Sequence, residues 1–270
     1  MTKKIGLVLS GGGAKGYAHI ALLKLLDELE IKPDIVAGTS MGAIIGAAYC
    51  SGMSGLEIEN KIKYFDIKRY ADITIPKSGL IKGDKLLNFF KEFYNNKNFE
   101  DLEIPIMINA VDIISGKEVI FSGGELSLAV RASMSIPGVV QPLEIGGRSL
   151  VDGGVINNIP ISLIKNQCDI IITSNVNYPI NQKPIYIKAE QKEDVRKNTQ
   201  NLLKIFMKTI YIMETNKKII EYAKQSSDIF ISPNLGKLTI MDFNKYNEIL
   251  KIGEEEVEKY KEKIKELLIL

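Results

Sequence analysis

Short apolar runs alternate with amphipathic helical segments along most of this 270-residue chain. Residues 169–174 form a mostly apolar run, typical of a central strand in a parallel sheet. The pattern predicts strands at residues 4–9, 34–37, 105–114, 118–121, 169–174 and 228–232. It predicts helices at residues 15–30, 43–50, 56–65, 85–94, 126–134, 190–222 and 243–270. This alternation indicates an α/β fold with a mainly parallel sheet.

The chain contains one histidine, His19, and two cysteines, Cys50 and Cys168. A single histidine cannot supply a multi-histidine metal site, and two distant cysteines do not favour a structural zinc site. The Ser–Asp–His order of α/β-hydrolases is also disfavoured, because no histidine follows position 19. The net charge of +2 gives no basic field for nucleic acid. We therefore expect neither a metal nor a nucleic-acid partner.

Residues 35–56 carry no charged side chain and are long enough to span a bilayer. Five glycines interrupt this stretch, together with serine and threonine, which favours a buried strand, a turn and a helix over a membrane span. At the N-terminus, the apolar run at residues 5–9 is too short for the core of a signal peptide. We expect a cytoplasmic protein, with peripheral contact at the inner membrane face.

A glycine-rich loop, Ser10-Gly11-Gly12-Gly13-Ala14-Lys15-Gly16, follows the first expected strand and opens a helix. Such a loop directs backbone N–H groups into one space and suits a phosphate or a transient oxyanion. It also satisfies the dinucleotide-binding pattern G-x-G-x-x-G, but the second strand ends without the acid that would hold a ribose. The P-loop interpretation fails, since Gly16-Tyr17 replaces Gly-Lys-Ser/Thr.

A second motif, Gly38-Thr39-Ser40-Met41-Gly42, lies between an expected strand and a helix of small residues. This is the setting of a nucleophile elbow, G-x-S-x-G, with Ser40 as the nucleophile. His19 lies on the apolar stripe of its helix, so we interpret it as a core residue rather than the base. The base must then be a carboxylate, and Asp152 is the candidate. Asp152 ends another apolar strand and precedes two glycines, which leave room for a neighbouring segment.

Four motifs in this order resemble those of the patatin-like phospholipase family. They are the loop at 11–16, the elbow at 38–42, the stretch at 131–138 and Asp-Gly-Gly at 152–154, followed by Asn157-Asn158-Ile159-Pro160. The resemblance covers residues 4–176 and is weak beyond about residue 180. The chain looks most like the short bacterial members, which are related to the catalytic domain of neuropathy target esterase.

The resemblance implies one hydrolase domain over residues 1–270, with a three-layer α/β/α architecture. It implies hydrolysis of lipid carboxyl esters, of the phospholipase A or lysophospholipase type, without metal or cofactor. The implied site residues are Ser40 and Asp152 as a catalytic dyad and Gly11, Gly12 and Gly13 as oxyanion donors. An aspartate with an ordinary pKa of about 3.9 is a weak base, so burial and oxyanion donors must compensate. Lys15 replaces the arginine of many members and either binds a lipid phosphate, stiffens the loop or is a solvated lysine in the first helical turn.

Two other classes of function stay open at this point. A lipid-binding regulatory protein with little turnover would show the same motifs. A dinucleotide-binding oxidoreductase is disfavoured by the missing ribose acid.

Two regions outside these motifs carry further hypotheses. Residues 60–98 hold nine basic and four acidic side chains and seven aromatic rings, which predicts a candidate cap that docks on anionic lipid. The helical C-terminal part, residues 190–270, ends in an apolar stripe from Phe243 to Leu267 with alternating steps of three and four. A dimer seam and a helix packed on its own domain both fit the stripe, and we favour the second.

Overall fold

The computed structural model describes residues 3–63, 65, 79–177, 208–213 and 215–269. These residues form an eight-stranded sheet of order β10-β9-β1-β2-β4-β8-β7, with β5 paired to β4. Five strands run parallel to one another: β1 (Ile5–Leu9), β2 (Ile35–Gly38), β4 (Ile106–Asp112), β9 (Ile170–Ser174) and β10 (Ile229–Ile231). Three strands run antiparallel to their neighbours: β5 (Lys117–Phe121), β7 (Leu143–Ile145) and β8 (Arg148–Asp152). A separate parallel pair joins β3 (Gly79–Ile81) to β6 (Gly138–Val140).

Helices cover both faces of the sheet, as expected for a three-layer α/β/α fold. The α-helices are α1 (His19–Glu28), α2 (Met41–Cys50), α3 (Gly55–Ile62), α4 (Asp84–Phe93), α5 (Leu126–Ser133), α7 (Lys217–Gln225), α8 (Tyr246–Glu258) and α9 (Lys261–Ile269). In β1, Leu7 and Leu9 pack with α1, α2 and α8, whereas Val8 packs with Ile220 and Ala223 of α7. Because both faces are buried, the strand is apolar throughout.

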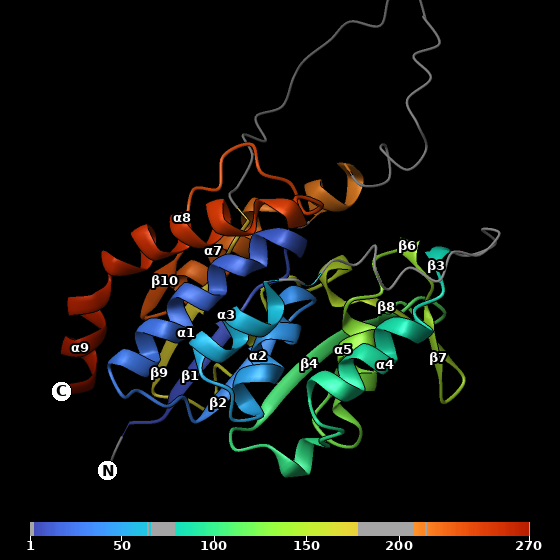
Figure 1. Ribbon diagram of the computed structural model, residues 1–270, viewed down its shortest axis with the longest axis horizontal. Coiled ribbons are helices and arrows are strands. Elements are labelled where there is room, and N and C mark those ends of the chain that lie inside the picture. Colours follow the sequence, from blue (N-terminus) through green and yellow to red (C-terminus); the bar gives the residue numbers. More distant parts are fainter. Residues whose placement is uncertain (1–2, 64, 66–78, 178–207, 214, 270) are drawn as a thin grey trace, which may run out of the picture.

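The C-terminal helix α8 packs on its own domain, beside α1 (Figure 1). Its stripe residues Tyr246, Leu250 and Val257 are buried. Gly253 allows the close approach, because a Cβ there would lie 2.9 Å from the Ala18 carbonyl oxygen. This confirms the interpretation of the stripe as a packing face. The single helix predicted for residues 243–270 is wrong, since a turn separates α8 from α9.

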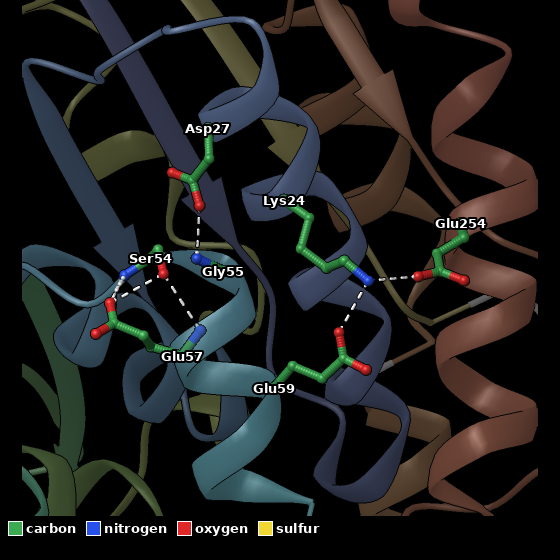
Figure 2. A network of polar contacts seen from close by, with 7 residues as sticks. All are labelled: Lys24, Asp27, Ser54, Gly55, Glu57, Glu59 and Glu254. Atoms are coloured by element: carbon green, nitrogen blue, oxygen red, sulfur yellow. Dashed lines mark hydrogen bonds and ion pairs between the residues drawn. The ribbon is translucent and has the colours of Figure 1, made fainter.

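A polar network fixes α1, α3 and α8 to one another (Figure 2). The Lys24 ammonium of α1 contacts Glu59 of α3 at 2.8 Å and Glu254 of α8 at 2.7 Å. Asp27 accepts a hydrogen bond from the Gly55 amide at 2.6 Å, next to the Ser54 capping box that begins α3. These contacts orient α1, α3 and α8 on the face of the sheet to which Leu7 and Leu9 of β1 point.

The aromatic rings of the proposed cap segment lie in the core wherever the structure describes them. Phe65, Phe90, Phe93 and Tyr94 are buried, and Phe89 packs against them. In α4, residues spaced by three and four direct these rings toward the core, where Phe89 is partly buried. The described rings therefore do not support docking on lipid, and the cap itself stays a prediction. Residues 64 and 66–78 lie outside the described residues, including Lys68 and Arg69.

Two other predictions concern the helix at residues 190–222 and the uncharged stretch at residues 35–56. The helix predicted at 190–222 lies outside the described residues up to 207, and the described part is interrupted at Asn216, whose side chain caps α7. The uncharged stretch 35–56 folds as β2, a turn and α2, as predicted. Among the described residues, every helix is too short or too polar to cross a bilayer.

Candidate active site

The carboxyl ends of β2 and β8 meet on one edge of β4. The first half of β4 pairs in parallel with β2, with Ile108 opposite Gly38. Its second half pairs antiparallel with β8, with Ala110 opposite Asp152, while β5 occupies the other edge. The two strands therefore approach each other head to head, separated by the position of Asn109. This topology brings the turn after β2 to the aspartate that ends β8.

Ser40 occupies a strained turn between β2 and α2. Its backbone has φ 52° and ψ −119°, a region that costs a residue with a side chain of order 1–3 kcal/mol. The Ser40 amide donates a 2.8 Å hydrogen bond to the hydroxyl oxygen of Ser133, which is fully buried. This is the geometry of a nucleophile elbow, as the G-x-S-x-G motif predicts.

Asp152 is buried at the end of β8, with 5% of its surface exposed. Burial raises the pKa of its carboxyl from 3.8 to about 6, because desolvation disfavours the charged form. Hydrogen bonds from the Ser40 side chain and the Gly154 amide oppose this rise; the second is 2.8 Å long. The carboxylate therefore contacts the candidate nucleophile and is a stronger base than an exposed aspartate.

The end of α5 holds both residues of this pair. Ser133 accepts the Ser40 amide, and the Ser135 carbonyl accepts the Asp152 amide at 3.0 Å. The Arg131 guanidinium donates to the Ser135 hydroxyl at 2.5 Å and to the Gly83 carbonyl at 3.1 Å. The motif at 131–138 thus holds the backbone of both Ser40 and Asp152, a role that the sequence alone did not predict.

The glycine-rich loop presents fewer amides than predicted. The Gly11 amide donates to the Asn158 carbonyl at 3.0 Å and is therefore already engaged. The amides of Gly12 and Gly13 have no acceptor among the described residues. The loop is held by Ala14, whose amide donates to the Ile240 carbonyl at 2.9 Å. Gly12 and Gly13 are thus the candidate donors to an oxyanion.

Lys15 is buried rather than solvated, with 3% of its surface exposed. Its ammonium lies 4.6 Å from the centroid of the Tyr211 ring and 3.5 Å from Asn177 Oδ1. Asn177 also donates to the Gly11 carbonyl at 2.7 Å. The interpretation of Lys15 as a solvated lysine is therefore wrong, because the side chain, which lies in the short 3-10 helix Gly13–Ala18, is buried against Tyr211 and Asn177.

His19 is a core residue, as expected. Its Nε2 lies 2.9 Å from the Ser10 carbonyl oxygen, and its Nδ1 lies 2.8 Å from the Ser174 hydroxyl. A carbonyl only accepts, so Nε2 carries the proton and Nδ1 accepts from Ser174. Complete burial lowers the pKa of the imidazole from 6.5 to about 4. His19 therefore supports the start of the glycine-rich loop as a neutral group.

A buried network behind the elbow was missed by sequence reasoning. The Thr39 hydroxyl donates to Asn109 Oδ1 at 2.8 Å. The Asn109 amide donates to the Asn157 carbonyl and to Glu118, both at 2.9 Å. These residues join β4, β5 and the loop after β8, so they fix the position of residues 157–158. In the sequence, only the stretch Asn157-Asn158-Ile159-Pro160, one of the family-like motifs, indicated this loop.

Comparisons with known proteins point to one family. Residues 7–164 match the family described as "Patatin-like phospholipase". An uncharacterized NTE family protein of Mycobacterium tuberculosis is 34% identical over 177 residues, which cover 64% of this chain and 49% of that protein. Lysophospholipase NTE1 of Kluyveromyces lactis is 27% identical over 268 residues, which cover 92% of this chain and 18% of that protein. The chain thus spans half or less of the length of these relatives.

Solved structures share the fold at low sequence identity. VipD from Legionella pneumophila has a TM-score of 0.68 at 12% identity, with 97% of this chain and 67% of that chain covered. The ExoU–SpcU complex from Pseudomonas aeruginosa gives a TM-score of 0.53 at 14% identity, with coverages of 97% and 53%.

Proposed function

Because the chain belongs to the patatin-like phospholipase family, we propose that residues 1–270 act as one serine hydrolase domain on lipid carboxyl esters. The substrates proposed are phospholipids or lysophospholipids, from which the enzyme releases a fatty acid. The observation that carries the proposal is the buried pair of Ser40 and Asp152, with the serine in a strained elbow and the carboxyl pKa raised to about 6.

In the proposed mechanism, Ser40 Oγ attacks the ester carbonyl carbon while Asp152 accepts the hydroxyl proton. The amides of Gly12 and Gly13 stabilise the oxyanion, and each such donor is worth about 10²–10³ in rate. Asp152 then gives its proton to the leaving alkoxide. Water hydrolyses the acyl-enzyme with Asp152 again as base. A base with a pKa of about 6 is ionised at neutral pH and accepts a proton more readily than an ordinary aspartate.

Lys15 has a proposed electrostatic role. Lys15 lies in the same short 3-10 helix as Gly13, and its ammonium contacts the ring of Tyr211. A buried positive charge behind the loop favours negative charge at the loop amides, whether on an oxyanion or on a lipid phosphate. The phosphate role is a proposal that rests on the charge and its place beside the loop.

We also propose peripheral contact with the inner face of the membrane, because residues 60–98 carry a local excess of five positive charges. Four of these basic residues, Lys61, Lys63, Lys68 and Arg69, follow one another closely in the sequence. Of the four, the structure describes Lys61 and Lys63, at the end of α3. Charge reversal at both should reduce hydrolysis of anionic vesicles at low salt and leave a short soluble ester unaffected. Equal rates on vesicles would contradict this contact.

The test of the dyad is covalent labelling with a fluorophosphonate probe. Wild type should be labelled, and Ser40→Ala should not. Asp152→Asn should fold and lose ester hydrolysis, whereas His19→Gln should lose stability more than turnover. Failure of the probe to label a folded wild type would refute the hydrolase. A labelled protein without turnover on a lipid panel would favour the lipid-binding regulatory role instead.

A further inference from the structure

The carboxamide of Asn158 is a buried polar group for which the mechanism so far has no use. Asn158 is 1% exposed, and neither its Oδ1 nor its Nδ2 has a hydrogen-bond partner among the described residues. A buried polar atom without a partner costs about 1–3 kcal/mol. Such groups are rare in folded proteins, so each requires an explanation.

This carboxamide lies between the two glycine motifs of the site. A Cβ on Gly11 would lie 2.3 Å from Asn158 Oδ1 and 3.3 Å from Ser40 Cβ. A Cβ on Gly154 would lie 2.8 Å from Asn158 Oδ1 and 3.1 Å from Asp152 Oδ1. Glycine at both positions is therefore what admits the side chain beside the dyad.

The backbone, rather than the side chain, fixes this position. The Asn158 carbonyl accepts the Gly11 amide at 3.0 Å, and the preceding carbonyl, of Asn157, accepts from Asn109 at 2.9 Å. The carboxamide thus contributes no hydrogen bond that holds the loop, yet the loop holds it next to Asp152.

Two acceptor oxygens face Gly154: Asn158 Oδ1 lies 2.8 Å and Asp152 Oδ1 lies 3.1 Å from the position that a Cβ would take there. Asp152 Oδ1 also accepts from the Gly154 amide at 2.8 Å, and a carboxylate oxygen can accept a further hydrogen bond. At neutral pH both are acceptors, so together they call for a group with two protons to donate. Water is such a group. With one O–H directed to each oxygen, it keeps a lone pair for attack on a carbon bound to Ser40.

We propose that Asn158 binds the water that hydrolyses the acyl-enzyme, an inference that rests on the proposed function. The water oxygen bonds to the acyl carbon while one proton passes to Asp152, and Asn158 Oδ1 holds the other O–H. The bond from the acyl carbon to Ser40 Oγ then breaks. Oγ takes the proton from Asp152, which releases the fatty acid and restores both residues.

We expect a variant without the Asn158 carboxamide to be defective only in deacylation, the second half of the reaction. With a p-nitrophenyl ester, Asn158→Ala should release the first equivalent of nitrophenol at a rate close to wild type. Its deacylation should be slower by about 10- to 100-fold, the effect expected for one hydrogen bond to a reacting group. Acyl-enzyme should accumulate on Ser40, as measured by intact-protein mass, and added hydroxylamine should discharge it faster than water does.

Asn157→Ala is the matched control, because the Asn157 amide donates to Glu118 and Ser162 instead. Its acylation and deacylation rates should keep the wild-type ratio even if both fall. Asn158→Ser, with a small polar side chain, provides a second variant if the alanine protein does not fold.

The outcomes separate the two proposals. Equal slowing of both steps in a folded Asn158 variant, or unchanged deacylation, overturns the role of Asn158 and leaves the hydrolase intact. No acyl-enzyme in any variant, together with no fluorophosphonate labelling of wild type, refutes the proposed function itself.

Discussion

Replacing Asp152 by asparagine should abolish hydrolysis and make the protein more stable at neutral pH. The folded state holds this carboxyl at a pKa of about 6, against 3.8 for an ordinary aspartate. Between these values the folded protein binds a proton that the unfolded chain does not. The contribution of Asp152 to wild-type stability therefore rises as pH falls from 7 to 4, and at pH 7.5 the ionised Asp152 destabilises the fold.

The magnitude follows from the difference between about 6 and 3.8, at 1.36 kcal/mol per pH unit. This gives an upper limit of about 3 kcal/mol, reduced by any loss in the bond from Gly154. A gain of about 1–3 kcal/mol corresponds to a melting temperature raised by about 2–10 °C in a domain of this size.

The assay is thermal unfolding of wild type and Asp152→Asn at pH 7.5 and pH 4.5. The gap should be largest at pH 7.5 and shrink at pH 4.5, where wild type is protonated. Asp112→Asn is the matched control on the paired strand, because the Ser115 hydroxyl lowers the pKa of Asp112 and this substitution should destabilise. A variant of Asp152 that melts below wild type at pH 7.5, or a gap independent of pH, would refute the reasoning.

Three further predictions concern the residues around the dyad. First, kcat/KM for a soluble ester should rise with pH and level off above an apparent pKa of about 6, because Asp152 must be ionised in the free enzyme. Second, Ser133→Ala should leave the Ser40 amide unpaired, lower the unfolding free energy by about 1–3 kcal/mol and slow fluorophosphonate labelling. Third, His19→Gln should melt below wild type at pH 7.5, with kcat nearly unchanged. Since the pKa of His19 falls from 6.5 to about 4 on folding, its stabilisation is lost as pH falls through this range, and the two melting temperatures should converge.

Each of these three predictions has an outcome that would contradict it. A flat activity profile between pH 5 and 8 would exclude Asp152 as the base in the rate-limiting step. Labelling of Ser133→Ala at the wild-type rate would show that its bond does not position the nucleophile; Ser127→Ala, on the same helix and bonded to Glu125, is the control. Loss of turnover in a His19→Gln protein with unchanged melting temperature would overturn the dyad.

The sequence predicted the parts of the site that depend on local backbone geometry. The elbow at Ser40 and the placement of His19 in the core follow from spacing along one strand or helix. The three-residue strands β3, β6 and β7 were missed, because so short a segment shows no periodicity.

The meeting of β2 and β8 on β4 also lay beyond local reasoning. It depends on a pairing register in which Asn109 separates the two strand ends, and register is a property of the whole sheet. For the same reason the oxyanion role that the resemblance implied for Gly11 did not take into account the carbonyl of Asn158, far along the chain, which accepts the Gly11 amide.

The opposite pKa shifts of His19 and Asp152 have a consequence for the folding equilibrium as a whole. Folding expels a proton from His19 and admits one to Asp152, so between about pH 4 and 6 the two exchanges offset each other. Counting only these two groups, folding takes up and releases nearly equal numbers of protons over this interval. The combined contribution of His19 and Asp152 to the pH dependence of wild-type stability is then almost flat, although both groups are strongly perturbed. Substituting either residue would expose the pH dependence that the other contributes.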